Sequence, residues 1–146
     1  MANWPYLDSP IPNEELIGKA KMNIGLYGFN KWKDMFNSRQ KLALITIMEK
    51  IKKSYEGIKE DCKNMVLGEY TINPEEAAKA VVGYLGLEVD RLADKNSVLC
   101  RLISQTEAIS FTYGRQALPM LWDYIEMNPL EHSSALTTIL KEIVAN

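Results

Sequence analysis

Two carboxylates, Asp90 and Asp94, stand four residues apart and therefore share one face of a predicted helix. Carboxylates placed in this way can act as a general acid and a general base. Arginines also lie close by in the sequence, so the pair can equally belong to a partly buried ion-pair network. We expect the second arrangement, and no catalytic residue in this chain. The predicted members of the network are Asp90, Arg91, Asp94, Arg101 and Asp123.

Metal and redox chemistry has little support. The chain contains two cysteines, Cys62 and Cys100, and one histidine, His132. Neither cysteine has a second cysteine or a histidine at ligand spacing, so we predict no metal site and interpret both as small, reduced core residues. A glycine-rich phosphate loop, a G-x-S-x-G elbow and an H-E-x-x-H motif are also absent from the sequence. We therefore predict no cofactor in this chain.

Polar and aromatic residues are concentrated in three segments, at 27–40, 90–101 and 113–124. Lysines and arginines in these segments can meet phosphates, and a tryptophan among them can stack on a base. Asparagine and glutamine side chains pair naturally with adenine, so Asn30, Asn96 and Gln116 can read a base edge. The candidate DNA-binding residues are Lys31, Trp32, Lys33, Arg39, Arg101, Arg115 and Gln116.

The same residues also have a structural interpretation. Trp32 and Phe36 are four residues apart and can pin the N-terminal segment to the rest of the fold. Arg39 and Arg115 can pair with aspartates inside the protein. The sequence leaves both interpretations open, because it does not separate a buried arginine from one that binds phosphate.

Helices must position these segments. The apolar spacing predicts one helix of about 25 residues from Asn37-Ser38, with either residue as its cap, and a second from Pro74, capped by Asn73. The second helix is apolar on most faces, so we expect it at the centre. Further helices are predicted over 117–127 and 134–144, and no strand pattern stands out.

The resulting fold class is all-α, a bundle of about four to five helices in a single domain. Residues 1–37 are rich in proline, glycine and aromatic residues and are predicted to form a long irregular arm that packs on the bundle. Residues 38–146 are predicted to form the helical bundle itself.

In this order and at this separation, the three segments resemble a region of the prokaryotic adenine-specific DNA methylases that contain a zinc ribbon. The resemblance covers most of the chain, from Ile11 to Leu130. Its most specific part is the run Tyr113-Gly114-Arg115-Gln116-Ala117-Leu118-Pro119-Met120, followed by Trp122-Asp123 and Asn128-Pro129.

The resemblance implies a fragment of a longer enzyme, an S-adenosylmethionine-dependent DNA adenine N6-methyltransferase. In that family a cofactor-binding glycine motif lies upstream of this region and an Asp-Pro-Pro-Tyr motif lies downstream. Neither motif occurs here, and the zinc-ribbon cysteines are missing. We therefore expect a non-catalytic helical domain that supports the catalytic fold or contacts DNA. The alternative is a protein–protein interaction module without nucleic-acid binding.

Composition limits the remaining possibilities. The chain has 146 residues, 17 Lys and Arg against 19 Asp and Glu, and a net charge of −2, which is not the balance of a protein that coats nucleic acid. A signal peptide and a long apolar run are absent from the sequence, so we expect a cytoplasmic protein without membrane contact. The expected partners are duplex DNA, the remaining parts of the methylase and a second copy bound through exposed apolar surface.

Overall fold

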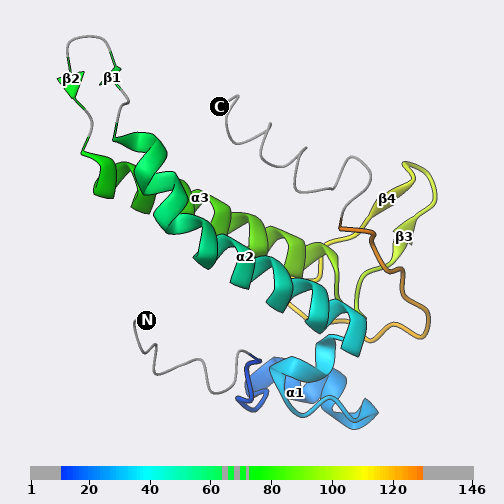
Figure 1. Cartoon of the computed structure of the whole chain (residues 1–146). Helices are drawn as coiled ribbons and strands as arrows, with labels where there is room; N and C mark the ends of the chain where they lie inside the picture. The colour runs from blue at the N-terminus through cyan, green and yellow to red at the C-terminus, as the bar shows by residue number, and fades with distance from the viewer. Residues whose placement is uncertain (1–10, 64–65, 68–69, 72, 130–146) are drawn as a thin grey trace. The chain divides into compact units, whose positions relative to one another are not determined.

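The computed structural model describes residues 11–63, 66–67, 70–71 and 73–129. The described chain is mostly helical, with α1 (Gly18–Ile24), α2 (Ser38–Cys62) and α3 (Pro74–Lys95) (Figure 1). It is not purely helical, because β1 (Val66–Leu67) pairs with β2 (Tyr70–Thr71) and β3 (Leu102–Ile103) pairs with β4 (Ala108–Ile109). Both pairs are antiparallel, and each strand is two residues long, too short for an alternating sequence pattern.

The chain divides into two compact units. The first unit combines Met1–Ala43 with Ala93–Met127, and the second combines Leu44–Leu92 with Asn128–Asn146. The predicted boundary between residues 37 and 38 does not coincide with this division. All the candidate DNA-binding residues fall in the first unit.

The N-terminal segment is more regular than the predicted arm. It contains α1 and two 3-10 helices, η1 (Gly25–Tyr27) and η2 (Trp32–Met35). In α1, Ala20 and Ile24 lie one turn apart on the same face, and Leu16 lies just before the helix. Gly28 follows η1 with φ at 91°, a conformation that glycine adopts without strain. Residues 1–10 of the predicted arm lie outside the described residues.

The core of the first unit joins the N-terminal segment to the segment after α3. Leu16, Ile24 and Met35 are fully buried and cluster with Leu99 and Leu118. Trp32, Phe29 and Phe36 pack against this cluster. Hydrogen bonds add to the packing, since the Val98 N–H donates to the Met35 carbonyl at 2.9 Å. Within the described residues, the aromatic-rich N-terminal segment thus shares its core with the segment after α3.

The predicted start of α2 is confirmed. Asn37 caps the helix, because its Oδ1 accepts the Gln40 N–H at 2.9 Å. Gln40 returns the bond, with its Oε1 accepting the Asn37 N–H at 2.9 Å. This reciprocal pair satisfies two backbone donors that a bare helix end would leave without partners. The helix ends at Cys62 and spans 25 residues, close to the predicted length.

The predicted start of α3 is also confirmed. Asn73 accepts the Glu75 N–H on its Oδ1 at 3.0 Å, and Pro74 is the first helical residue. Glu75 then pairs with Lys79 at 2.8 Å, one turn along. The prediction that this helix is covered on most faces is wrong, because Val81, Tyr84 and Leu87 are exposed.

The helix predicted over 117–127 is absent from the structure. Its backbone donors find partners in a distant segment instead, with the Ile125 N–H donating to the Cys100 carbonyl at 3.0 Å. The Met127 N–H similarly donates to Asn96 Oδ1 at 3.4 Å. These contacts tie the end of the segment to residues 96–100, and its helical spacing of apolar residues is not used. The helix predicted over 134–144 lies outside the described residues.

Among the helices described, none combines the length and the apolar character that crossing a bilayer would require.

Candidate functional site

The end of α3 anchors the segment that carries the most specific motif. The Asp94 carbonyl accepts the Thr112 N–H at 2.7 Å and the Thr112 hydroxyl at 2.6 Å. The Asp94 carboxylate accepts the Tyr113 N–H at 2.9 Å. Burial, and then the nearby Asp94 carboxylate, raise the pKa of the Tyr113 phenol. Asp94 therefore fixes the position of the chain just before Arg115.

Arg101 is positioned by the β3–β4 hairpin. Its N–H donates to Ser110 Oγ at 2.9 Å, and its carbonyl accepts the Ser110 N–H at 2.9 Å. These bonds extend the strand pairing, in which Leu102 lies opposite Ile109. The Arg101 backbone is thus held in place, while the residue itself is exposed.

A pocket of about 400 Å³ lies against this hairpin. Two of its lining residues are arginines, Arg101 and Arg115, and no aspartate or glutamate lines it. Neither arginine forms an ion pair with a residue that the structure describes. The remaining lining residues are Leu99, Ile103, Ser110, Phe111, Thr112, Gly114, Pro119 and Leu121.

A second pocket, of about 220 Å³, shares Arg115 with the first. Trp32 and Gln116, both candidate DNA-binding residues, line it with Ala20, Tyr113, Ala117 and Leu118. Trp32 is only partly buried, although it also packs on the core. The two pockets together bring four of the seven candidates, Trp32, Arg101, Arg115 and Gln116, to one region of the first unit.

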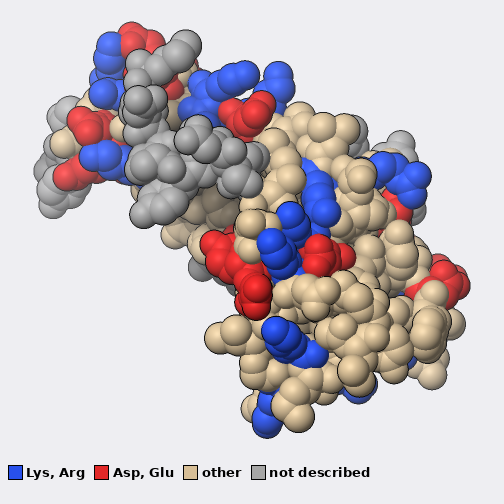
Figure 2. Space-filling model, turned by 90° about the horizontal axis from the view of Figure 1, so that it is seen from below, with Lys and Arg blue, Asp and Glu red and all other residues tan. Residues whose placement is uncertain are grey.

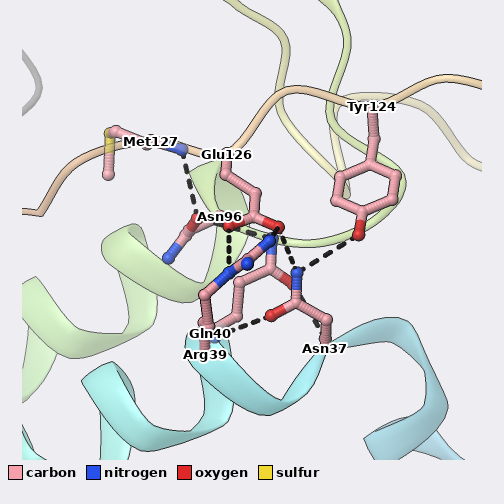
Figure 3. A network of polar contacts seen from close by, with 7 residues as sticks. All are labelled: Asn37, Arg39, Gln40, Asn96, Tyr124, Glu126 and Met127. Carbon is pink, nitrogen blue, oxygen red and sulfur yellow. Dashed lines mark hydrogen bonds and ion pairs between the residues drawn. The ribbon is translucent and has the colours of Figure 1, made fainter.

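Arg39 has a different environment. Its guanidinium binds the Glu126 carboxylate through both oxygens, at 2.7 and 3.0 Å (Figure 3). Asn37 donates its side-chain amide to Glu126 and to the Tyr124 hydroxyl. The hydrogen bond from Arg39 is the main reason why the pKa of Glu126 is lowered and that of Arg39 is raised. Arg39 thus joins the start of α2 to residue 126, and its partner is Glu126 rather than one of the aspartates that the sequence suggested.

Substituting Glu126→Gln should make the stability of the protein less dependent on acidic pH. The lowered pKa of Glu126 means that its contribution to folding is complete above the ordinary value of 4.5 and is lost as the pH falls below it. The variant should therefore be less stable than the parent at pH 7, and the gap should narrow at about pH 3. Urea midpoints at the two pH values measure this.

The matched control for that experiment is Glu107→Gln, because Glu107 is exposed and has no ion-pair partner among the described residues. The Glu107→Gln variant should have nearly the same urea midpoint as the parent at both pH values. A constant gap between the parent and Glu126→Gln at both pH values would show that the Arg39 pair does not contribute to the acid dependence.

Of the two lysine candidates, Lys31 directly precedes η2 and Lys33 lies within it. Lys31 donates its ammonium to Asn13 Oδ1 at 3.0 Å. The pKa of Asp34 is lowered overall. Desolvation is the largest single effect and raises this pKa, but the hydrogen bonds from the Lys31 and Asn30 N–H groups and the charge of Lys33 together outweigh it. Neither Lys31 nor Lys33 lines the two pockets.

The predicted ion-pair network is not what organises Asp94. In the first unit, no ion pair between described residues joins Asp94 or Asp123 to Arg101. Asp94 instead accepts the hydrogen bonds from Thr112 and Tyr113 that are described above. Asp90 and Arg91 are exposed residues of the second unit.

Metal-binding side chains do not gather in the part of the chain that the structure describes, where no group of three or more His, Cys, Asp or Glu is placed to hold an ion. Cys62 and Cys100 are free and buried. On the face drawn in Figure 2, Lys and Arg side chains are interspersed with Asp and Glu.

Protein-family models, curated proteins and solved structures give no match to this chain. The expected resemblance to the DNA methylases therefore stays a prediction from the sequence motifs.

Reasoning from the sequence missed Ser97, Thr112 and Glu126 as organising residues. Ser97 and Thr112 are buried and joined through their hydroxyls at 2.8 Å, and Cys100 lies beside both. Short hydroxyl side chains occur throughout any sequence, so nothing marked these two. Glu126 lies 87 residues from Arg39, and no local pattern marked it as the partner of this arginine.

Proposed function

We propose that this chain is a non-catalytic, helix-rich domain that contacts nucleic acid through its first unit. The assignment to an adenine-specific DNA methyltransferase, as a part that supports the catalytic fold or helps to hold DNA, follows from the resemblance of the three segments. The observation that carries the proposal is the position of Arg115, which lines one pocket with Arg101 and the other with Trp32 and Gln116.

The chemistry of these residues supports the contact. A guanidinium binds phosphate through two parallel hydrogen bonds, and Arg101 and Arg115 have no competing carboxylate among the described residues. The partly exposed indole of Trp32 offers a surface for a base. The Gln116 amide carries both a donor and an acceptor, as recognition of a base edge requires.

The contact is local rather than broad. The chain has a net charge of −2, and basic and acidic side chains are mixed on the face shown in Figure 2. Few phosphates can then be neutralised, so we expect a dissociation constant of about 10⁻⁴ to 10⁻⁶ M at physiological salt, the range of non-specific binding.

A polarisation titration tests the proposal with the full chain and a labelled DNA duplex at two salt concentrations. Binding should weaken as salt rises, and Arg115→Gln should reduce the slope of log affinity against log salt by about 1. Lys19→Gln is the matched control, because it removes one charge from α1 of the same unit and lines neither pocket. Absence of binding at tens of micromolar protein in low salt, or equal effects of the two substitutions, would contradict the proposal.

Exposed apolar side chains favour the alternative function, a protein–protein interaction module. Leu26 is 89% exposed and Trp122 is 84% exposed, and Tyr27 meets Trp122 edge to face with ring centroids 5.4 Å apart. Ile17 and Met22 are exposed in the same unit. Large exposed apolar side chains are typical of interfaces when they are contiguous. An interaction module would give no salt-dependent DNA binding in the titration above.

A further inference from the structure

The charged side chains that line the pocket beside the β3–β4 hairpin are all positive. Arg101 and Arg115 line it, and the Lys95 ammonium lies 5.2 Å from the ring centroid of Phe111, another lining residue. No acidic side chain lines it, and no described carboxylate forms an ion pair with either arginine. Unneutralised positive charge in a recess favours an anion, and two guanidiniums suit the several oxygens of a phosphate.

The rest of the lining is mostly apolar, which a bare inorganic anion would not use. A volume of about 400 Å³ lies within the range of small-molecule sites, about 300–1,000 Å³. Phe111 is 47% exposed and offers a flat ring. Aromatic rings of this kind stack on nucleobases with little dependence on the base. The lining therefore suits a flat organic body that carries a phosphate.

The walls of the pocket are already held in place. Thr112 is fixed to the Asp94 carbonyl, and Ser110 is fixed to Arg101. Gly114 packs closely on Phe111, since a Cβ at this glycine would lie 3.3 Å from the Phe111 Cβ. A preformed site loses less conformational freedom when a ligand binds.

We propose that this pocket binds a single nucleoside monophosphate group, with Arg101 and Arg115 on the phosphate and Phe111 against the base. The group can be a free nucleotide or the terminal unit of a strand. The proposal extends the proposed function, because it requires one nucleotide to bind without the rest of a nucleic acid.

Isothermal titration of the full chain with AMP, adenosine and inorganic phosphate at low salt tests this. AMP is chosen because adenine carries only one exocyclic polar group, its amino group, to place against a mostly apolar lining. AMP should bind saturably at one site, and adenosine and phosphate should each bind at least about tenfold more weakly, because each lacks one of the two interactions. The affinity for AMP should fall in each of three variants, Arg101→Gln, Arg115→Gln and Phe111→Leu. It should not change in Lys19→Gln. Circular dichroism of each variant checks that its helices are retained.

The outcomes separate this inference from the proposed function. Equal binding of phosphate and AMP, AMP binding unchanged in Arg115→Gln, or no AMP binding would overturn the nucleotide site. If AMP does not bind but the DNA duplex still binds with the expected dependence on Arg115, the inference fails and the proposed function stands. If AMP binds and neither a duplex nor a 5′-phosphorylated strand does, the site is one for free nucleotides and the proposed function fails.

Discussion

Replacing Leu16 with alanine should lower the free energy of unfolding by about 2–5 kcal/mol. Leu16 is 0% exposed and belongs to the cluster that joins the N-terminal segment to Leu99 and Leu118. Removing most of its side chain leaves a cavity in a core that has few other buried residues to fill it. The Leu16 N–H, which donates to the Asn30 carbonyl at 2.8 Å, is unaffected by the substitution.

Its neighbour Ile17 provides the control, because Ile17 is 76% exposed and lies at the same end of α1. Ile17→Ala should change the free energy of unfolding by no more than about 0.5 kcal/mol. Urea unfolding followed by tryptophan fluorescence and by circular dichroism measures both variants. Equal losses for Leu16→Ala and Ile17→Ala would mean that the N-terminal segment is not part of the core.

The two long helices could be predicted because their starting signals are local. Asn37 and Asn73 each cap a helix within three residues of themselves, and these contacts are formed as the sequence indicates. Such short-range bonds do not depend on the rest of the fold. The burial of α3 could not be predicted in the same way, since an apolar side chain such as Tyr84 or Leu87 does not specify what covers it.

The segment over 117–127 shows why helical spacing alone can mislead. Leu118, Leu121, Trp122 and Ile125 are spaced as on one helical face, yet Leu118 is buried and Trp122 is exposed. The Ile125 and Met127 N–H groups bind the Cys100 carbonyl and the Asn96 side chain. Long-range acceptors of this kind provide hydrogen bonds for the backbone N–H groups without a helix. The local sequence pattern does not indicate them.

The sequence named candidate residues but did not indicate their arrangement, in which four of the seven line the two pockets. Arg39 and Arg115 looked equivalent in the sequence, and the structure separates them. Glu126, 87 residues along the chain, binds Arg39, whereas Arg115 lines both pockets. Which carboxylate reaches which arginine is decided by tertiary packing, so no local pattern could distinguish an arginine engaged in the fold from one available to a ligand.

The buried hydroxyl of Thr112 leads to the second large prediction. Thr112→Val should lower the free energy of unfolding by about 1–3 kcal/mol, the cost of leaving a buried polar group without its partner. The Thr112 hydroxyl donates to the Asp94 carbonyl at 2.6 Å, so its hydrogen is used there. The Ser97 hydroxyl, 2.8 Å away, must then donate to Thr112 Oγ1. Valine fills the same space but removes that acceptor from Ser97, which is 0% exposed.

Two further substitutions show whether the hydroxyl itself is responsible. Thr112→Ser keeps the oxygen and should retain most of the stability that valine removes. Thr106→Val makes the same change at an exposed position in the turn between β3 and β4, and it should alter the free energy of unfolding by no more than about 0.5 kcal/mol. Urea unfolding of the three variants measures the differences. Equal losses for valine at 106 and at 112 would contradict the proposed role of the Thr112 hydroxyl.

A double-mutant cycle carries this prediction one step further. Ser97→Ala removes the hydroxyl that donates to Thr112, but it also leaves the Leu99 N–H, which Ser97 Oγ accepts at 3.0 Å, without its partner. The double variant Ser97→Ala with Thr112→Val should therefore lose less than the sum of the single losses, with a coupling of about 0.5–3 kcal/mol. Simple additivity would mean that the two hydroxyls act independently. Coupling would show that the anchoring of Thr112, and with it the position of Arg115 beside the pocket, depends on one shared polar cluster at the end of α3.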